Sequence, residues 1–345
     1  MPPRRGCRQH CWRGPAARRC RPPWRSFDPS GRRCRPSLRR CRSPTPGRGP
    51  AFATIWAMLR HLSLLVRAMR PRHWLKNGFV LAPAVFSGHA FDVPVLGRAA
   101  ATALAFCLAA SAGYLVNDVL DRESDRADPV KRRRPVASGE MAVPAALAWA
   151  AALFVAAVAI TTLQGTAVLL ALAGYIAITT LYSVYLKVVP ILEALVLASG
   201  FLVRLVAGAL AIRVVISHWL VICGFLLALL LAFGKRMPEA VHPSQRTPTY
   251  PVSFLHDVVT MLAGVTLVAY TLYTVAPDTT AKFGSRALLL TVPMVLFGVL
   301  RYLLLLHREG AQDPTSTLFA DRPLLLAVAA WAVAAGAIVH FGGPR

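Results

Sequence analysis

The sequence is poor in charged residues, and acidic residues are the scarcest of them. Only 16% of the 345 residues are charged, and 15 Asp and Glu stand against 39 Lys and Arg. Hydrophobic residues make up 56% of the chain, and the mean hydropathy is +0.51. A chain of this composition cannot surround itself with an ordinary water-facing surface. A pair of soluble domains is therefore excluded, although the length would allow it.

Cysteine is nearly absent from the apolar part of the chain. Cys107 and Cys223 lie inside apolar segments and are interpreted as packing residues. The other five cysteines fall within the first 57 residues, where no paired Cys-x2-Cys motif occurs. The spacing of Cys7 and Cys11 leaves zinc as a weak alternative, and no disulfide framework is indicated.

The first 57 residues lack apolar periodicity. They hold fifteen Arg, one Asp and no Lys, and so carry +14 of the formal net charge of +24, together with ten of the 26 Pro. We predict that residues 1–57 are a disordered basic extension, or a stretch translated from upstream of a true start at Met58. They contain no apolar core of a secretory signal. A nucleic-acid-binding arm is an alternative, but aromatic residues are few and we expect no nucleic-acid partner.

The remainder, residues 58–345, is a series of apolar segments close to the ~20 residues that cross a bilayer. We predict an all-α, polytopic bundle of about nine transmembrane helices, and many Ala, Gly and Ser residues indicate close helix packing. The first segment is the weakest, because Pro83 and Gly88 interrupt it. The predicted spans are 76–91, 96–116, 142–162, 165–186, 189–212, 216–233, 257–276, 287–306 and 323–341.

Lys and Arg are concentrated before the first predicted span and in the loops after the second, fourth, sixth and eighth, as in the run 131–134. The positive-inside rule then places the N-terminus and these loops in the cytoplasm and the C-terminus outside. We therefore expect a multi-pass protein of the cytoplasmic (inner) membrane, with its chemistry on the cytoplasmic side.

Five of the fifteen acidic residues fall between Asp118 and Asp128. If the second helix continues two turns past the membrane edge, Asn117, Asp121 and Asp125 share one face and Asp118 lies beside them. Stacked like charges favour a bound cation, and Mg²⁺ prefers one or two carboxylates together with phosphate oxygens. The alternative is a solvated acidic loop balanced by neighbouring Arg. We predict a metal–diphosphate site in which the three aspartates hold Mg²⁺ and Asn117 positions a metal-bound water or a phosphate oxygen.

Polar and basic residues close to the membrane edge are candidate substrate ligands, although positive-inside topology and anionic lipids also account for such residues. Arg204 and Glu193 lie within one span, ~16 Å apart along the axis, so they cannot pair with each other. Arg204 needs another partner, for which a phosphate in an internal cavity is a candidate. The full set of predicted substrate ligands is Lys76, Asn77, Lys131, Arg132, Arg134, Tyr182, Lys187, Arg204, Lys235, Arg236 and Glu239.

Several motifs and their order along residues 66–341, approximately, resemble those of the UbiA-type membrane prenyltransferases. These motifs are Arg-Pro-Arg-His-Trp-Leu-Lys-Asn (70–77), Asn-Asp-x2-Asp-x3-Asp (117–125) and Lys-Arg-x-Arg-Pro-x-Ala-x-Gly (131–139). Later stretches are similar to the decaprenyl-phosphate phosphoribosyltransferase branch. They are Tyr-Ser-Val-Tyr-Leu-Lys (182–187), Gly-Phe-x2-Arg-x3-Gly (200–208), Gly-Lys-Arg-x2-Glu (234–239), Asp-Pro-Thr (313–315) and Asp-Arg-Pro-Leu (321–324).

This resemblance implies a nine-helix bundle with a cytoplasm-facing polar cavity open to lipid, in which Mg²⁺ holds the diphosphate of phosphoribosyl diphosphate. Family members that use a prenyl diphosphate donor have a second Asp-rich motif after the sixth helix, where this chain has Lys235, Arg236 and Glu239. We therefore expect transfer of phosphoribose to a polyprenyl (decaprenyl) phosphate, in a protein that can form homo-oligomers. The alternatives are prenyl transfer to an aromatic acceptor such as 4-hydroxybenzoate, and a non-enzymatic transporter.

Overall fold

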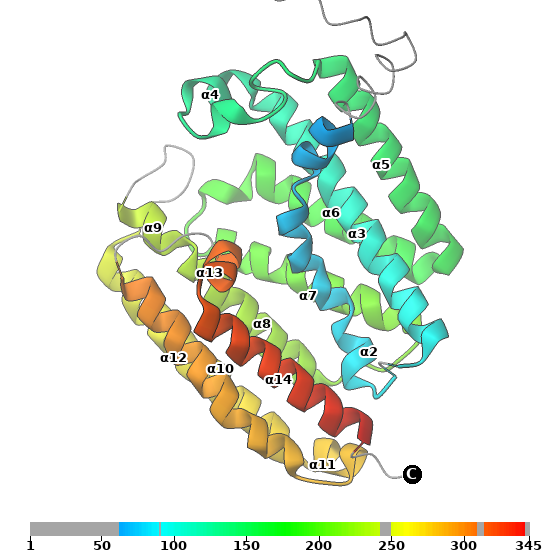
Figure 1. Ribbon diagram of the computed structural model, residues 1–345, viewed down its shortest axis with the longest axis vertical. Helices are drawn as coiled ribbons and strands as arrows, with labels where there is room; N and C mark the ends of the chain where they lie inside the picture. The colour runs from blue at the N-terminus through cyan, green and yellow to red at the C-terminus, as the bar shows by residue number, and fades with distance from the viewer. Residues whose placement is uncertain (1–61, 90, 242–249, 309–313, 342–345) are drawn as a thin grey trace, which may run out of the picture. The chain divides into compact units, whose positions relative to one another are not determined.

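The computed structural model describes residues 62–89, 91–241, 250–308 and 314–341 (Figure 1). Helices account for all regular secondary structure in these ranges, which confirms the predicted all-α class. The predicted basic extension, residues 1–57, and the alternative start at Met58 lie outside the described residues.

Eight helical spans in the described part of the chain are long and apolar enough to cross a membrane, and this identifies a multi-pass membrane protein. Large apolar side chains within the spans, such as Leu170 of α6 and Val333 of α14, project outward, as expected for a surface that faces lipid. The helices of these spans are α3 (Val93–Leu120), α5 (Val143–Gln164), α6 (Thr166–Val184), α7 (Leu192–Ile212), α8 (His218–Gly234), α10 (Val252–Val275), α12 (Val292–His307) and α14 (Arg322–Phe341).

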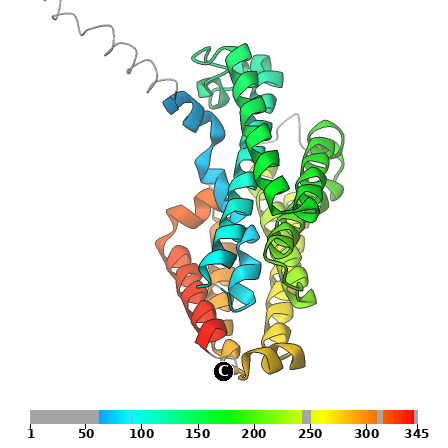
Figure 2. The same ribbon diagram turned by 90° about the vertical axis from the view of Figure 1, so that its right-hand side faces the viewer.

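The spans are joined by short helices and turns. The connecting elements are α4 (Arg122–Ala127), η2 (Lys131–Arg133), η3 (Leu186–Val188), α9 (Arg236–Val241), α11 (Pro277–Phe283), η4 (Ala287–Thr291) and α13 (Pro314–Ala320). Successive spans run antiparallel, so that α4, η3, α9 and α13 all lie at one end of the bundle (Figures 1 and 2). We call this the site end. It carries the loops that the sequence predicts to be cytoplasmic.

The first predicted span, 76–91, differs from a regular transmembrane helix. A helix at residues 62–69 is followed by the 3₁₀-helix η1 (Pro71–Val80) and the short α2 (Ala82–Phe86). Pro83 has no N–H to donate to the Val80 carbonyl three residues earlier, so regular helical bonding is interrupted there.

The interrupted segment nevertheless runs from one end of the bundle to the other. Arg70 contacts Asp118 at the site end, and the carbonyl of Phe86 accepts a hydrogen bond of 3.0 Å from Lys282 of α11 at the opposite end. The segment is therefore a ninth crossing, built from a 3₁₀-helix and a short α-helix.

A glycine allows this crossing to pack closely on α7. A Cβ atom at Gly208 would overlap the carbonyl oxygen of Val80. Small residues at helix interfaces let backbones approach in this way, and Cα–H contacts to carbonyl oxygens accompany such approaches. Gly208 thereby fixes η1 beside α7, which carries Arg204 one turn closer to the site end.

Candidate active site

The acidic motif occupies the point where α3 leaves its span. Helix α3 ends at Leu120, and Asp121 links it to α4. Hydrogen bonds of 2.8 Å from the Asp121 N–H to Asn117 and from the Asp125 N–H to Asp121 carry the helical path through this junction. The motif thus stays on one nearly continuous helical path beyond the span.

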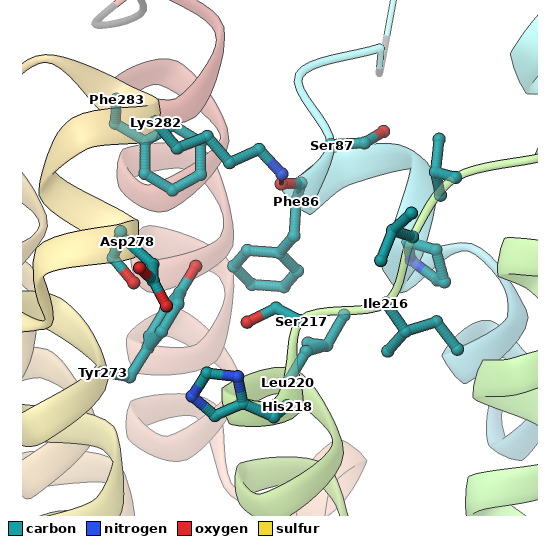
Figure 3. Close-up of a pocket in the computed structure, with 14 residues that line it drawn as sticks. Phe86, Ser87, Ile216, Ser217, His218, Leu220, Tyr273, Asp278, Lys282 and Phe283 are labelled. Atoms are coloured by element: carbon teal, nitrogen blue, oxygen red, sulfur yellow. Dashed lines mark hydrogen bonds between the residues drawn. The ribbon is translucent and has the colours of Figure 1, made fainter.

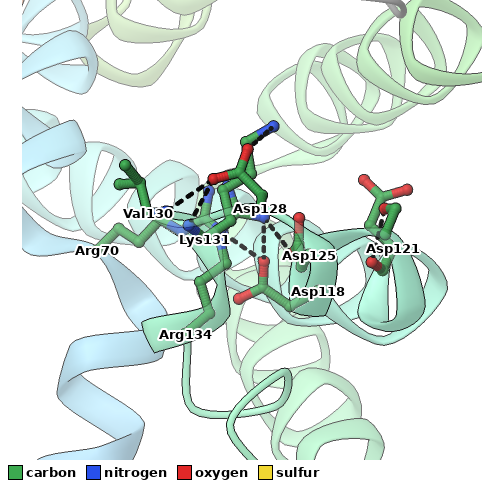
Figure 4. Close-up of polar contacts among 9 residues, drawn as sticks. Arg70, Asp118, Asp121, Asp125, Asp128, Val130, Lys131 and Arg134 are labelled. Carbon is green, nitrogen blue, oxygen red and sulfur yellow. Dashed lines mark hydrogen bonds and ion pairs between the residues drawn. The ribbon is translucent and has the colours of Figure 1, made fainter.

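Burial separates the four predicted residues into two groups. Asp118 and Asp125 are each only 1% exposed, whereas Asn117 is exposed and Asp121 is half-buried. Figure 4 shows Asp121 on the other side of the helix from the pair. The inward face of this helical path is therefore formed by Asp118 and Asp125, while Asn117 and Asp121, two turns and one turn before Asp125, are more exposed.

Two arginines from separate segments hold the buried aspartates. Arg134 Nη1 lies 2.6 Å from Asp125 Oδ2 and 3.3 Å from Asp118 Oδ1, so one guanidinium bridges two carboxylates. Arg70 also donates to Asp118 Oδ1 (Figure 4). The Arg70 guanidinium lies 4.9 Å from the ring centroid of Tyr114. Burial lowers the pKa of Arg70 from its ordinary value, while Asp118 acts in the opposite direction.

One oxygen of this cluster fits a metal ion. Asp118 Oδ2 is buried and has no hydrogen-bond partner among the described residues. A buried carboxylate oxygen without a donor is costly, and a cation satisfies it. No three His, Cys, Asp or Glu side chains in the described ranges converge as a preformed metal cage. This donor set suits Mg²⁺, which takes one or two carboxylates and fills its other positions with water and substrate oxygens.

The loop after α4 is folded back toward the cluster. The Asp128 carboxylate accepts hydrogen bonds from the N–H groups of Lys131 (3.0 Å) and Val130 (2.8 Å), and these bonds lower its pKa. Arg126 Nε donates to the Ala137 carbonyl at 3.0 Å. Lys131 lies 3.7 Å from Asp128, while Arg132 is exposed. Of the predicted basic ligands in this loop, Arg134 alone is inserted between the aspartates.

A second polar cluster lies at the site ends of α6, α7 and α9. Arg236 is 1% exposed, and its guanidinium forms a two-point ion pair with the fully buried Glu193. It also binds Glu239 and donates to the Tyr182 hydroxyl at 3.2 Å. Three of the predicted ligands, Arg236, Glu239 and Tyr182, are thus brought together, but mainly as partners of one another.

Glu193 is the member of this cluster that the sequence interpretation did not include among the candidate ligands. Tyr250 supports it by donating to Glu193 Oε1 at 3.3 Å and accepting from the Ile191 N–H at 2.7 Å. Ile191 has a φ of 66°, a left-handed conformation that is rare for a β-branched residue. The sequence does contain a signal for the Glu193–Arg236 pair: an acidic residue at the edge of one span and an arginine at the matching edge of a later span.

The internal Arg204 is bound by uncharged groups. Its guanidinium donates to the Asn77 side-chain oxygen (2.7 Å), the Tyr175 hydroxyl (2.9 Å) and the Gly200 carbonyl (2.9 Å). The Asn77 amide also donates to Cys107 Sγ at 3.1 Å. Asn77, one of the predicted substrate ligands, is therefore held within this interior network.

The remaining predicted ligands are Lys76, Lys187 and Lys235, and all three are half-buried. Lys187 follows α6 and Lys235 separates α8 from α9, so both flank the Arg236 cluster. No described carboxylate forms a salt bridge with Lys187 or Lys235.

A cavity of about 260 Å³ lies at the opposite end of the bundle (Figure 3). Its lining includes Phe86 of α2, Ser217 before α8, Tyr273 of α10 and Lys282 of α11. Burial lowers the pKa of Lys282. None of the predicted site residues lines this cavity. The cavity and the aspartates lie at opposite ends of the transmembrane spans.

Comparisons with known proteins agree with this architecture. Residues 79–321 match the model of the UbiA prenyltransferase family. A decaprenyl-phosphate phosphoribosyltransferase from Mycolicibacterium smegmatis is 33% identical over 299 residues, which cover 81% of this chain and 93% of that protein. The Mycobacterium tuberculosis protein of the same name is 34% identical over 295 residues, covering 81% and 95%.

A solved structure shows the same fold at lower identity. The UbiA homolog from Archaeoglobus fulgidus, determined bound to GPP and Mg²⁺, superposes with a TM-score of 0.59 at 18% identity, covering 80% of this chain and 99% of that one. The family resemblance expected from the sequence is thereby confirmed. The chain is a membrane enzyme that belongs to the UbiA prenyltransferase family.

Proposed function

We propose that this protein transfers 5-phosphoribose from phosphoribosyl diphosphate to a polyprenyl phosphate in the cytoplasmic membrane, with the aspartates facing the cytoplasm. The proposal is supported by relatives at 33% and 34% identity that are named for this type of reaction. The structural observation that carries it is the unpartnered, buried oxygen of Asp118 within a cluster of two aspartates and two arginines.

Mg²⁺ would be held by Asp118, through the buried Oδ2 that has no described partner, with Asp125 secured beside it by Arg134. When bound, the metal supplies charge neutralisation of the diphosphate leaving group. Arg134 keeps Asp118 and Asp125 close together despite their like charges. Arg70 binds Oδ1 of Asp118, which leaves Oδ2 for the metal. The cluster is thus pre-organised before substrate arrives.

The reaction itself needs little acid–base chemistry from the chain. A phosphate oxygen of the lipid forms the new bond to the anomeric carbon, and the bond from that carbon to diphosphate breaks. Because the phosphate nucleophile is already ionised, no general base is required. The main contributions of the protein are alignment of two anions and stabilisation of the departing diphosphate.

Cations without a described carboxylate partner are the best candidates to bind the substrate phosphates. Lys187 and Lys235 meet this criterion at the site ends of α6 and α8, as does Arg132 in the loop after α4. Arg236 is neutralised by Glu193 and Glu239, so its role is to hold the backbone that presents Lys235. Its contribution to binding is therefore indirect.

The proposal is tested with the purified full-length protein, labelled phosphoribosyl diphosphate, polyprenyl phosphate and Mg²⁺. We expect a labelled, lipid-extractable product. Asp118→Asn should lower turnover by at least about 100-fold, because it removes the charge that binds the metal. Glu123→Gln, a change of an exposed acid on neighbouring α4, is the matched control and should retain activity.

Three outcomes would reject the proposal. The first is a folded Asp118→Asn variant with wild-type turnover. The second is a lack of phosphoribosyl product together with transfer from a prenyl diphosphate to 4-hydroxybenzoate. The third is a lack of product from wild type and control with either substrate pair, which would reject both enzymatic assignments.

A further inference from the structure

Two histidines outside the aspartate site face each other across a helix interface at the site end. His256 lies in the second turn of α10, and His307 is the last residue of α12. Their neighbours Leu255 and Leu306 are 0% and 4% exposed and belong to one apolar cluster, which fixes the spacing of the two helices. The histidine rings themselves reach toward solvent.

The hydrogen bonds of His307 define which of its nitrogens carries hydrogen. His307 Nδ1 lies 2.8 Å from the Leu303 carbonyl oxygen, and a carbonyl can only accept. Nδ1 is therefore the protonated nitrogen of neutral His307. The lone pair on its Nε2 is then directed at His256 Nδ1, which is 2.9 Å away.

This arrangement is the one that metal-binding histidines use. A ligating histidine almost always donates its other ring N–H to a carboxylate or a backbone carbonyl, and that bond fixes the tautomer and the ring orientation. The Leu303 carbonyl performs this role for His307. His256, which is half-buried, becomes a second ligand when its hydrogen moves from Nδ1 to Nε2, because a neutral imidazole has both tautomers available.

We propose that His256 and His307 form a binding site for a divalent transition-metal ion, with Zn²⁺ as the representative ligand. Imidazole nitrogen suits Zn²⁺, Cu²⁺ and Ni²⁺, whereas Mg²⁺ selects oxygen, so this site and the aspartate site differ in the ions they take. The two rings are inclined by 45° with centroids 4.3 Å apart, so they are not stacked face to face.

The geometry requires a small adjustment. Zn–N bonds of ~2.0–2.1 Å in a tetrahedral site place the two nitrogens ~3.4 Å apart, so the rings must separate by ~0.5 Å. His307 ends its helix and is exposed, which permits that movement. The described residues supply no third His, Cys, Asp or Glu, and water completes the coordination. The bound ion would join the site ends of α10 and α12.

The test measures Zn²⁺ binding to the full-length protein in detergent, with thiols alkylated and Mg²⁺ in excess. Alkylation removes the cysteines as zinc ligands, and Mg²⁺ occupies carboxylate sites. A chromophoric chelator competes for Zn²⁺ and reports stoichiometry. Wild type should bind one more Zn²⁺ per chain than His256→Ala or His307→Ala. His340→Ala, which removes an exposed histidine at the far end of α14, should bind as wild type does.

A second measurement separates loss of a ligand from loss of structure. Without Zn²⁺ the variants should unfold at the wild-type temperature, since both side chains lie at the surface. Added Zn²⁺ should raise the unfolding temperature of wild type and His340→Ala only, because ligand binding to the native state stabilises it. His307→Gln, which keeps a polar side chain, should behave like His307→Ala. Equal Zn²⁺ stoichiometry in all variants, or an equal rise in unfolding temperature, would overturn the proposal.

Discussion

Three arginines of the polar clusters differ in what neutralises them, and of these Arg204 and Arg236 are buried while Arg134 is half-buried. Arg236 lies against Glu193 and Glu239, and Arg134 lies against Asp118 and Asp125. Arg204 has only uncharged oxygens as its described hydrogen-bond partners. A buried charge costs several kcal/mol unless it is paired, so each of these side chains depends strongly on its specific partners.

Glu193→Gln should destabilise the protein by about 3 kcal/mol, because it leaves the buried Arg236 guanidinium with a single carboxylate partner. Thermal unfolding in detergent measures the effect. Glu239→Gln is the matched control, since Glu239 binds the same guanidinium but is partly exposed, and its loss should cost less.

A double-mutant cycle shows whether the effect belongs to the pair. Glu193→Gln combined with Arg236→Met should be less destabilising than the sum of the two single changes, because the double variant has no uncompensated arginine. Strict additivity would show that Glu193 and Arg236 do not interact.

The sequence located the aspartate motif but did not identify which of its members turn inward. At 3.6 residues per turn, Asn117 and Asp125 are offset by about 80° around the axis, whereas Asp118 and Asp125 are offset by about 20°. Helical geometry alone thus favours the observed pair. Which face turns inward depends on Arg70 and Arg134, and their positions come from packing between distant segments that local patterns do not encode.

At the scale of elements, the irregular crossing is the main departure from the sequence prediction. Residues 76–91 are apolar, and Pro83 signalled an interruption, but apolar length cannot distinguish a 3₁₀-helix from an α-helix. The eight later spans were predictable, because a continuous apolar stretch of ~20 residues crosses a bilayer as an α-helix, which satisfies its own backbone hydrogen bonds.

Gly208→Ala should destabilise the protein by about 1–3 kcal/mol, because the added methyl group overlaps the Val80 carbonyl and forces η1 away from α7. Unfolding temperature in detergent measures this effect. Turnover should fall as well, since η1 begins next to Arg70 of the aspartate cluster.

Gly174→Ala is the matched control. It makes the same substitution in helix α6, at a position where a Cβ would meet nothing within 4 Å. This variant should be as stable as wild type or slightly more stable, because alanine favours helix over glycine by up to about 1 kcal/mol. Equal behaviour of the two variants would show that the contact of Gly208 with Val80 is unimportant.

For the whole molecule, the distribution of Lys and Arg predicts that the site end faces the cytoplasm. Ser138 lies in an exposed loop at the site end, and Ala281 is exposed on α11 at the opposite end. Single cysteines at these two positions, in a background without native cysteines, report the orientation.

A membrane-impermeant thiol reagent should label Ala281→Cys in intact cells and Ser138→Cys only after lysis. Thiol labelling of both variants in lysed cells confirms that each cysteine is accessible. The reverse pattern in intact cells would contradict the assigned orientation and would move the aspartates outside the cytoplasm.

The crossing at residues 71–86 changes the number of membrane crossings in the described part of the chain from even to odd. The eight regular spans alone would return the last residue of α14 to the side where helix 62–69 lies. With the irregular crossing the number is odd, so these two points lie on opposite sides of the bilayer. A reporter joined after α14 would then report on the compartment opposite the one in which the proposed reaction would release diphosphate.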